Sequence, residues 1–320
     1  MAFADLKNDY IFRRIFGSHP ELLRGLLNDL LERSGDTSIE EIEYLPSEQM
    51  PLAAGAKLSI MDVRCKDRAG TRFVVEMQLI HMRGFLNRVV YNACKGYAEQ
   101  LATGQPYTAL SDVVAISICD FELWPDAEQD ENHLARVPML SRWYVTERTL
   151  DSAREPNRLL QVQYAFLELP KIPKEKPSSG AGLWAWLFAN APKLTEVPAD
   201  MPPGPQRSAL DLAREARMTY LELEAYRRVA DEIQQARDYG EEKEAKGRAK
   251  GLAEGTAIGL AQGTALGLAK GVLALLSARG LAVTDESRAR IEGCTELERL
   301  QRWLIAAAHV ATVEEVFADP

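Results

Sequence analysis

The N-terminal residues carry apolar side chains at the three- and four-residue steps of an amphipathic helix. Tyr10, Ile11, Ile15 and Phe16 follow this period. The segment GSHPE interrupts it with a glycine and a proline, and ELLRGLLNDLLER resumes it. We therefore expect helical structure over 5–33, with a break between its two halves.

A period of two then replaces the helical period, which is typical of strands. We expect strands over 39–45, 58–65, 72–80, 112–123, 134–147 and 158–169. Residues 84–103 return to one apolar helical face, and GQPY ends that helix. A sheet with helices before and between its strands indicates an α/β or α+β fold. We expect this domain to span residues 1–170.

The remainder of the chain is predicted to be all-α. Residues 171–240 are expected to extend the core with helices, ending in one long charged helix from Ser208 to Tyr239. Residues 241–271 hold a glycine at every fourth position from 247, seven in all, which costs about 6–7 kcal/mol of helix propensity relative to alanine. This segment is interpreted either as a helix packed on another copy through its small residues or as a linker. Residues 272–320 are predicted to form a small domain of three or four short helices.

The amino-acid composition excludes some classes of function for this protein. Hydrophobic residues make up 46% of the chain, which is enough for a substantial core, and the formal net charge is −9. Such a charge excludes a generic basic nucleic-acid coat, although not an enzyme that holds nucleic acid through a local patch and metal ions. The four cysteines form no C-x-x-C pair, the N-terminus lacks an apolar signal segment, and the uncharged stretch 255–269 is too short to span a membrane. We expect a cytoplasmic protein without a membrane segment.

Two acidic residues lie on neighbouring predicted strands in MDVRCKDRAGTRFVVEMQ. A turn centred on Ala69 places Asp62 opposite Glu76 and Ile60 opposite Gln78, with directly opposed Cβ atoms about 5 Å apart. Carboxylates this close repel each other unless one is protonated or a cation lies between them, and Mg²⁺ or Mn²⁺ suits oxygen ligands. A divalent ion here predicts phosphodiester hydrolysis. The alternative is a structural hairpin whose acids face solvent.

Three sequence blocks resemble a known family. LKNDYIFRRIFG, KLSIMDVRCKDRAGTRFVVEMQL and RVVYNACKGYAEQLATGQPYTAL resemble the Rpn recombination-promoting nucleases, also described as transposases, of the PD-(D/E)XK superfamily. The resemblance covers roughly residues 5–170, and the glycine repeat with a helical module also resembles the C-terminal segments that often accompany this domain in bacterial proteins. It implies a restriction-endonuclease-like core, a mixed sheet flanked by helices, and a metal-dependent DNA endonuclease that promotes recombination or mobile-element transposition.

Carried over to this chain, the resemblance makes Asp62 and Glu76 the metal ligands. Gln78 stands where most of the superfamily has lysine, and glutamine can orient water or phosphate but carries no charge. We expect the missing cation to come from the following helix, where Arg88 and Lys95 lie seven residues apart with Tyr91 between them. The alternative for these three is a solvated helix edge.

Two further residues are weaker candidates. Asp9 is expected either to add a carboxylate from the first helix or to serve, like Asn8, as an ordinary N-cap. His81 is expected either to shuttle protons or to have no role beyond the end of its strand.

A second function class remains open. The neutral Gln78 and the acidic net charge are also consistent with a nuclease fold that binds DNA or regulates without catalysis. In either class we expect residues 241–320 to associate into a homo-oligomer.

Overall fold

The computed structural model describes residues 2–46, 48–49, 59–60, 62–125, 137–146 and 158–318. The chain divides into two compact units, Met1–Ala236 and Arg237–Pro320. The first contains every described strand and the second is helical.

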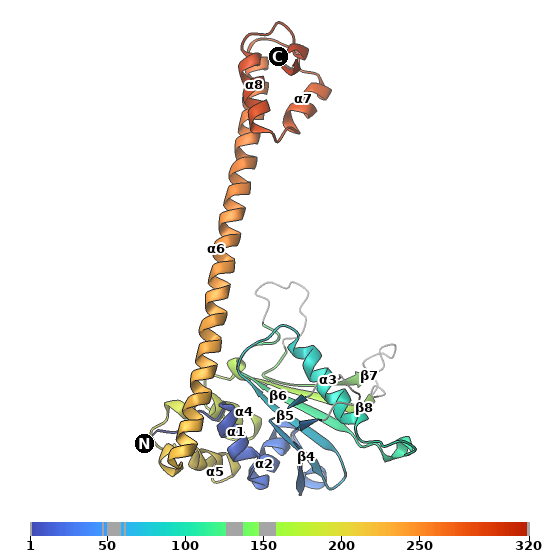
Figure 1. Ribbon diagram of the computed structural model, residues 1–320, viewed down its shortest axis with the longest axis vertical. Coiled ribbons are helices and arrows are strands. Elements are labelled where there is room, and N and C mark those ends of the chain that lie inside the picture. Colours follow the sequence, from blue (N-terminus) through green and yellow to red (C-terminus); the bar gives the residue numbers. More distant parts are fainter. Residues whose placement is uncertain are drawn as a thin grey trace. The chain divides into compact units, whose positions relative to one another are not determined.

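The first unit is built on a six-stranded mixed sheet with the order β1-β4-β5-β6-β8-β7 (Figure 1). Its strands are β1 (Ile42–Leu45), β4 (Val63–Asp67), β5 (Arg72–Gln78), β6 (Val113–Cys119), β7 (Leu140–Thr146) and β8 (Arg158–Glu168). The central strands β5, β6 and β8 are parallel, and antiparallel strands complete both edges. A separate two-stranded sheet pairs β2 (Glu48–Gln49) with β3 (Ser59–Ile60). The predicted α/β class with a mixed sheet is therefore confirmed.

The β4–β5 hairpin has the register that its turn predicts. Val63 pairs with Val75 and Lys66 with Arg72, which places Asp62, the residue before β4, opposite Glu76. Gly70 adopts a φ of +90° in the turn, a backbone conformation that favours glycine in short hairpin loops. The predicted pairing of Gln78 with Ile60 is wrong, because β3 pairs with β2 and Ile60 lies opposite Glu48.

Helices cover both faces of this sheet (Figure 1). The main core joins one face, including Phe73, Val75 and Met77, to four helices. These are α1 (Asp9–Phe16), α2 (Pro20–Leu30), α4 (Gly180–Asn190) and α5 (Pro205–Leu212). On the other face Val74 packs with Phe85 of α3 (Phe85–Ala98). The face that carries Glu76 is thus covered by a helix, which differs from the solvent-facing alternative.

The long charged helix predicted from Ser208 to Tyr239 is wrong, because the chain ends α5 at Leu212 and begins α6 (Tyr220–Ala278) after a short 3₁₀ turn. Hydrogen bonds between Thr219 and Glu222 mark the start of α6, so α5 and α6 do not form one helix. The main-chain N–H of Thr219 donates to Glu222 Oε2 at 2.7 Å, and the N–H of Glu222 donates to Thr219 Oγ1 at 3.3 Å. This reciprocal capping box starts a new helix, and its T-x-x-E pattern is visible in the sequence.

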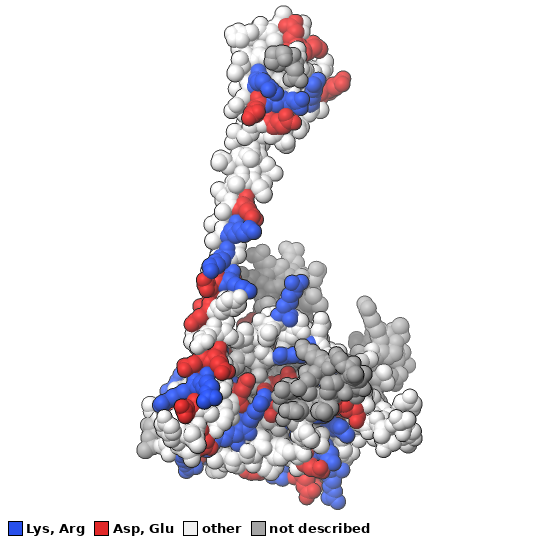
Figure 2. All heavy atoms as spheres, viewed as in Figure 1, with Lys and Arg blue, Asp and Glu red and all other residues white. Residues whose placement is uncertain are grey.

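The second unit contains a small apolar core. Ala269, Val272 and Leu276 of α6 pack with residues of α7 (Asp285–Glu292) and α8 (Leu297–Ala307). The glycine repeat is helical throughout as part of α6. Figure 2 shows charged side chains of both signs along the first part of α6 and an uncharged section after them. By length and composition α6 is the one described helix with an 18-residue window apolar enough to cross a membrane, and one such helix is weak evidence for a span.

Candidate active site

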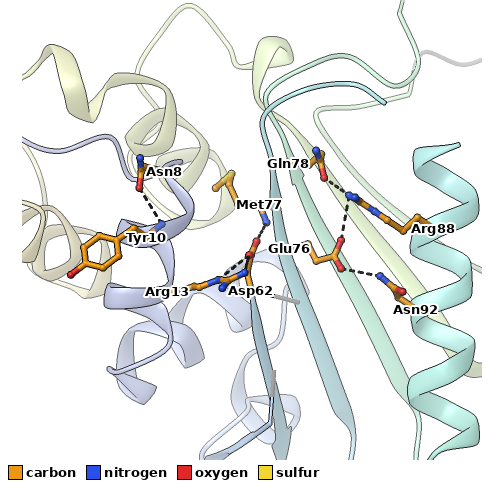
Figure 3. Close-up of polar contacts among 9 residues, drawn as sticks. All are labelled: Asn8, Tyr10, Arg13, Asp62, Glu76, Met77, Gln78, Arg88 and Asn92. Atoms are coloured by element: carbon orange, nitrogen blue, oxygen red, sulfur yellow. Dashed lines mark hydrogen bonds and ion pairs between the residues drawn. The ribbon is translucent and has the colours of Figure 1, made fainter. Parts of the chain in front are cut away.

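A cavity of about 920 Å³ opens at the carboxyl end of β5. Helix α1 lines it with Asp9 and Arg13, β5 with Glu76 and its two successors, and α3 with residues that include Arg88. Figure 3 shows α1 and α3 on opposite sides of the strands, with Arg13 of α1 and with Arg88 and Asn92 of α3 reaching the strand residues between them. The cavity therefore collects side chains from three elements that are distant in the sequence.

Asp62 is held in this cavity by contacts to both of its oxygens. The main-chain N–H of Met77, the residue after Glu76 on β5, donates to Oδ2 at 2.7 Å. Arg13 donates to Oδ1 from Nε at 3.2 Å and from Nη2 at 2.9 Å (Figure 3). The backbone of β5 and a cation from α1 thus fix this carboxylate.

Glu76 is buried on the neighbouring strand and is held from the other side. Asn92 of α3 donates from Nδ2 to Oε1 at 3.1 Å, and Arg88 Nη2 lies 3.9 Å from Oε2. Burial raises the pKa of the Glu76 carboxyl, and the charge of Asp62 raises it further, whereas Arg88 and the hydrogen bond from Asn92 lower it. The effect of Asp62 on Glu76 indicates that the two carboxylates lie close enough to repel each other.

Gln78 and Arg88 contact each other at the cavity mouth. Arg88 Nη2 donates to Gln78 Oε1, and Gln78 Nε2 donates to the carbonyl oxygen of Ile80 at 3.0 Å. Arg88 Nε is buried without a hydrogen-bond partner among the described residues. Arg88, the cation expected from the helix after β5, therefore reaches both Glu76 and Gln78. Gln78 stands at the position where most of the superfamily has lysine.

Asp9 brings a third carboxyl group to the cavity. Asn8, not Asp9, caps α1, because Asn8 Oδ1 accepts the N–H groups of Tyr10 and Ile11. Burial and the charge of Asp62 raise the pKa of Asp9 to about 6, and Arg13 opposes this shift. Of its two expected roles, the structure therefore excludes the N-cap and leaves a carboxyl group beside Asp62.

Not every predicted site residue lines the cavity. Tyr91 does, and its side chain is exposed. Lys95, one further turn along α3, is buried and lies 3.9 Å from Glu99. His81 is exposed and packs edge-on against Phe121, outside the lining residues.

Arg13 and Asn92 were missed by the sequence reasoning. Each is four residues from a candidate on the same helix, Arg13 after Asp9 and Asn92 after Arg88. Residues four apart lie on one helical face. That spacing was the available signal, and it did not indicate which strand residue each side chain would reach.

The donor set suits a hard divalent cation. Asp9, Asp62 and Glu76 are acidic side chains of one cavity, and carboxylate oxygens are the ligands that Mg²⁺ and Mn²⁺ prefer. Burial is the largest cause that raises the pKa of Asp9 and of Glu76, and the charge of Asp62 adds to the rise in both. Among the described residues, however, no three or more His, Cys, Asp or Glu side chains are grouped so that they could together hold a metal ion.

Comparison with known proteins identifies the family of this chain. A family model described as PD-(D/E)XK nuclease family transposase matches residues 6–241. No curated protein and no solved structure gives a significant match. The match covers the mixed sheet, the hairpin that carries Asp62 and Glu76, and the helices on both faces. The chain belongs to the PD-(D/E)XK nuclease family transposases.

Proposed function

We propose that this protein is a Mg²⁺- or Mn²⁺-dependent DNA endonuclease that hydrolyses phosphodiester bonds. The observation that carries the proposal is the juxtaposition of Asp62 and Glu76 at one open cavity, each beside a guanidinium. Family membership supports a nuclease, whose substrate is DNA. Promotion of recombination or mobile-element transposition in the bacterial cytoplasm is the setting that we propose for it.

In this proposal each residue has a distinct role. Asp62 and Glu76 would hold the metal ion, which when bound would supply Lewis-acid polarisation of a phosphoryl oxygen and a water of lowered pKa. Gln78, a neutral donor and acceptor, orients the water or the phosphate. Arg88 stabilises the charge that develops on the phosphate, and its buried unpartnered Nε supports this role. Tyr91 contacts the nucleic acid at the rim, and Lys95 is left out because it is buried.

Two observations favour a second candidate function, a nuclease fold that binds DNA without cutting it. Gln78 carries no charge, and the described residues contain no group of three or more His, Cys, Asp or Glu side chains that could hold a metal ion. The family match is compatible with both functions, because a fold persists when catalysis is lost.

Plasmid cleavage separates the two candidates. Supercoiled plasmid is incubated with Mg²⁺ or Mn²⁺ and wild type, Asp62→Ala or Glu76→Ala, and nicked and linear products are quantified. Nicking by wild type that drops at least about 100-fold in both variants supports the endonuclease. Nicking that survives both substitutions excludes this site, and metal-independent DNA binding without cleavage supports the second candidate.

We also propose that residues 241–320 associate between copies. The apolar residues Leu252, Ile258 and Leu260 of α6 are exposed, and a Cβ added at Gly255 or Gly259 meets nothing within 4 Å in a single chain. Sedimentation of the full chain and of a 1–240 truncation tests this. If both are monomers the proposal fails; if only the full chain associates, Gly255→Leu should weaken the association.

A further inference from the structure

Asp62 and Glu76, two of the three acidic residues of the cavity, each lie between a neutral donor and an arginine. One oxygen accepts from a neutral N–H donor: Asp62 Oδ2 from Met77 at 2.7 Å, and Glu76 Oε1 from Asn92 at 3.1 Å. The other oxygen faces a guanidinium, Arg13 Nη2 at 2.9 Å and Arg88 Nη2 at 3.9 Å respectively. The neutral donors fix orientation, and the arginines supply charge on the cavity side.

The two ends of the Arg13–Asp62 pair differ in freedom. The Asp62 side chain is 10% exposed, whereas the Arg13 side chain is 47% exposed and lines the cavity. Both Nε and Nη2 of Arg13 contact the same oxygen, Oδ1, so Oδ2 is not involved and the fork geometry that binds a carboxylate through both oxygens is not used. The Asp62 carboxylate is therefore fixed, whereas the Arg13 side chain contacts only one of its oxygens and can move away.

We infer that Arg13 is a phosphate-binding residue that exchanges between Asp62 and a phosphate of the nucleic acid. The inference rests on the proposed function and adds a residue of α1 to the substrate contacts. A divalent cation and Arg13 compete for Asp62 Oδ1, since two cations at one oxygen repel each other. A guanidinium released into the cavity matches the geometry of a phosphate, and the length and exposure of Arg13 allow the movement.

Arg14 provides a matched comparison on the same helix. Its Nε contacts Glu222 Oε1 at 2.7 Å and its Nη1 donates to the carbonyl oxygen of Leu212 at 3.0 Å. Arg14 is not among the cavity-lining residues. Removing either arginine changes the net charge of the protein equally, so only a local role distinguishes them.

The test measures binding of Mn²⁺ alone, by the loss of the free-ion EPR signal, in wild type, Arg13→Gln, Arg14→Gln and Asp62→Asn. Arg13→Gln should bind Mn²⁺ about two- to fivefold more tightly, because a competing cation is removed. Arg14→Gln should match wild type. Thermal unfolding of each variant establishes that it is folded.

The second readout is binding of a fluorescent 20-base-pair duplex in Ca²⁺ over a series of salt concentrations. Arg13→Gln should weaken binding and reduce the slope of log affinity against log salt by about 0.9, the contribution of one phosphate contact. Arg13→Lys should restore the slope as a point charge.

Two outcomes overturn the inference, and they are distinguishable. If Mn²⁺ binds wild type and is weakened in Asp62→Asn, but Arg13→Gln binds it no more tightly or keeps the wild-type salt slope, the inference alone fails. If wild type and Asp62→Asn bind Mn²⁺ equally or not at all, the proposed metal site fails and the inference falls with it.

Discussion

Asp62, on the α1 side of the cavity, and Glu76, on the α3 side, are held by different kinds of group. On the α1 side, Asp62 accepts a main-chain N–H, which no side-chain substitution removes, and Arg13 adds an exposed cation. On the α3 side, the anchor of Glu76 is the side chain of Asn92, and Arg88 reaches both Glu76 and Gln78. The fold itself therefore positions Asp62, whereas Glu76 depends on two side chains of one helix.

The largest effect is expected on the α3 side from Arg88→Gln. Removing the guanidinium takes away the charge that lowers the pKa of Glu76. Since Glu76 must be ionised to hold a metal, the acid limb of the pH–activity profile should move to higher pH. Cleavage at neutral pH should fall about 100-fold. Plasmid nicking measured across pH checks this, and an Arg13→Gln effect of equal size would remove the contrast between the two sides.

A somewhat smaller effect is expected from Asn92→Ala. The amide that orients Glu76 is lost, and loss of a group that orients a metal ligand typically costs about 10- to 100-fold in metal affinity or activity. Mn²⁺ binding and nicking should fall together. Val90→Ala, an exposed position on the same helix, is the control and should leave both unchanged. Wild-type Mn²⁺ affinity in Asn92→Ala would show that Glu76 is held by other means.

On the α1 side, Asp9→Asn should stabilise the protein at neutral pH. The folded pKa of Asp9, about 6, lies above its ordinary value of 3.8, so the ionised group destabilises the fold as pH rises through this interval. Solvent screening and the favourable charge at the helix N-terminus reduce the gain to about 1 kcal/mol. Denaturant unfolding at pH 7.5 and pH 3.5 should show a difference only at the higher pH. A difference that persists at pH 3.5 would point to a cause other than ionisation.

The smallest effect is expected from Arg14→Gln, on the face of α1 away from the cavity. Arg14 is the main cause that lowers the pKa of Glu222 to about 2, so this pair stabilises the fold above pH 4.5 and loses its contribution as pH falls toward 2. A partly exposed pair is worth about 0.5–1 kcal/mol. The variant should be less stable than wild type at pH 7 and equal to it near pH 2, with nicking unchanged. Reduced nicking would mean that α1 cannot be divided into a structural and a catalytic face.

Part of the site was accessible from the sequence because it depends on local rules. The length of the turn at Gly70 and the period of two on each strand suffice to place Asp62 opposite Glu76 and to direct Phe73 and Val75 into the core. The break between α5 and α6 is equally local, since the capping box of Thr219 and Glu222 lies within four residues. The prediction of one continuous helix there was wrong although the signal was present.

Local sequence alone sets the order of helices and strands, the register of the hairpin and the pair of acids that it brings together, because backbone sterics and side-chain alternation act over a few residues. Tertiary packing determines which helical side chains contact Asp62 and Glu76. Arg13 meets Asp62 across 49 residues. Seven residues of helix separate Arg88 from Lys95 by about 10.5 Å along the axis, so docking of α3 on the sheet leaves Arg88 at the cavity and buries Lys95. Such contacts depend on how whole elements pack, and no periodicity within one element specifies that.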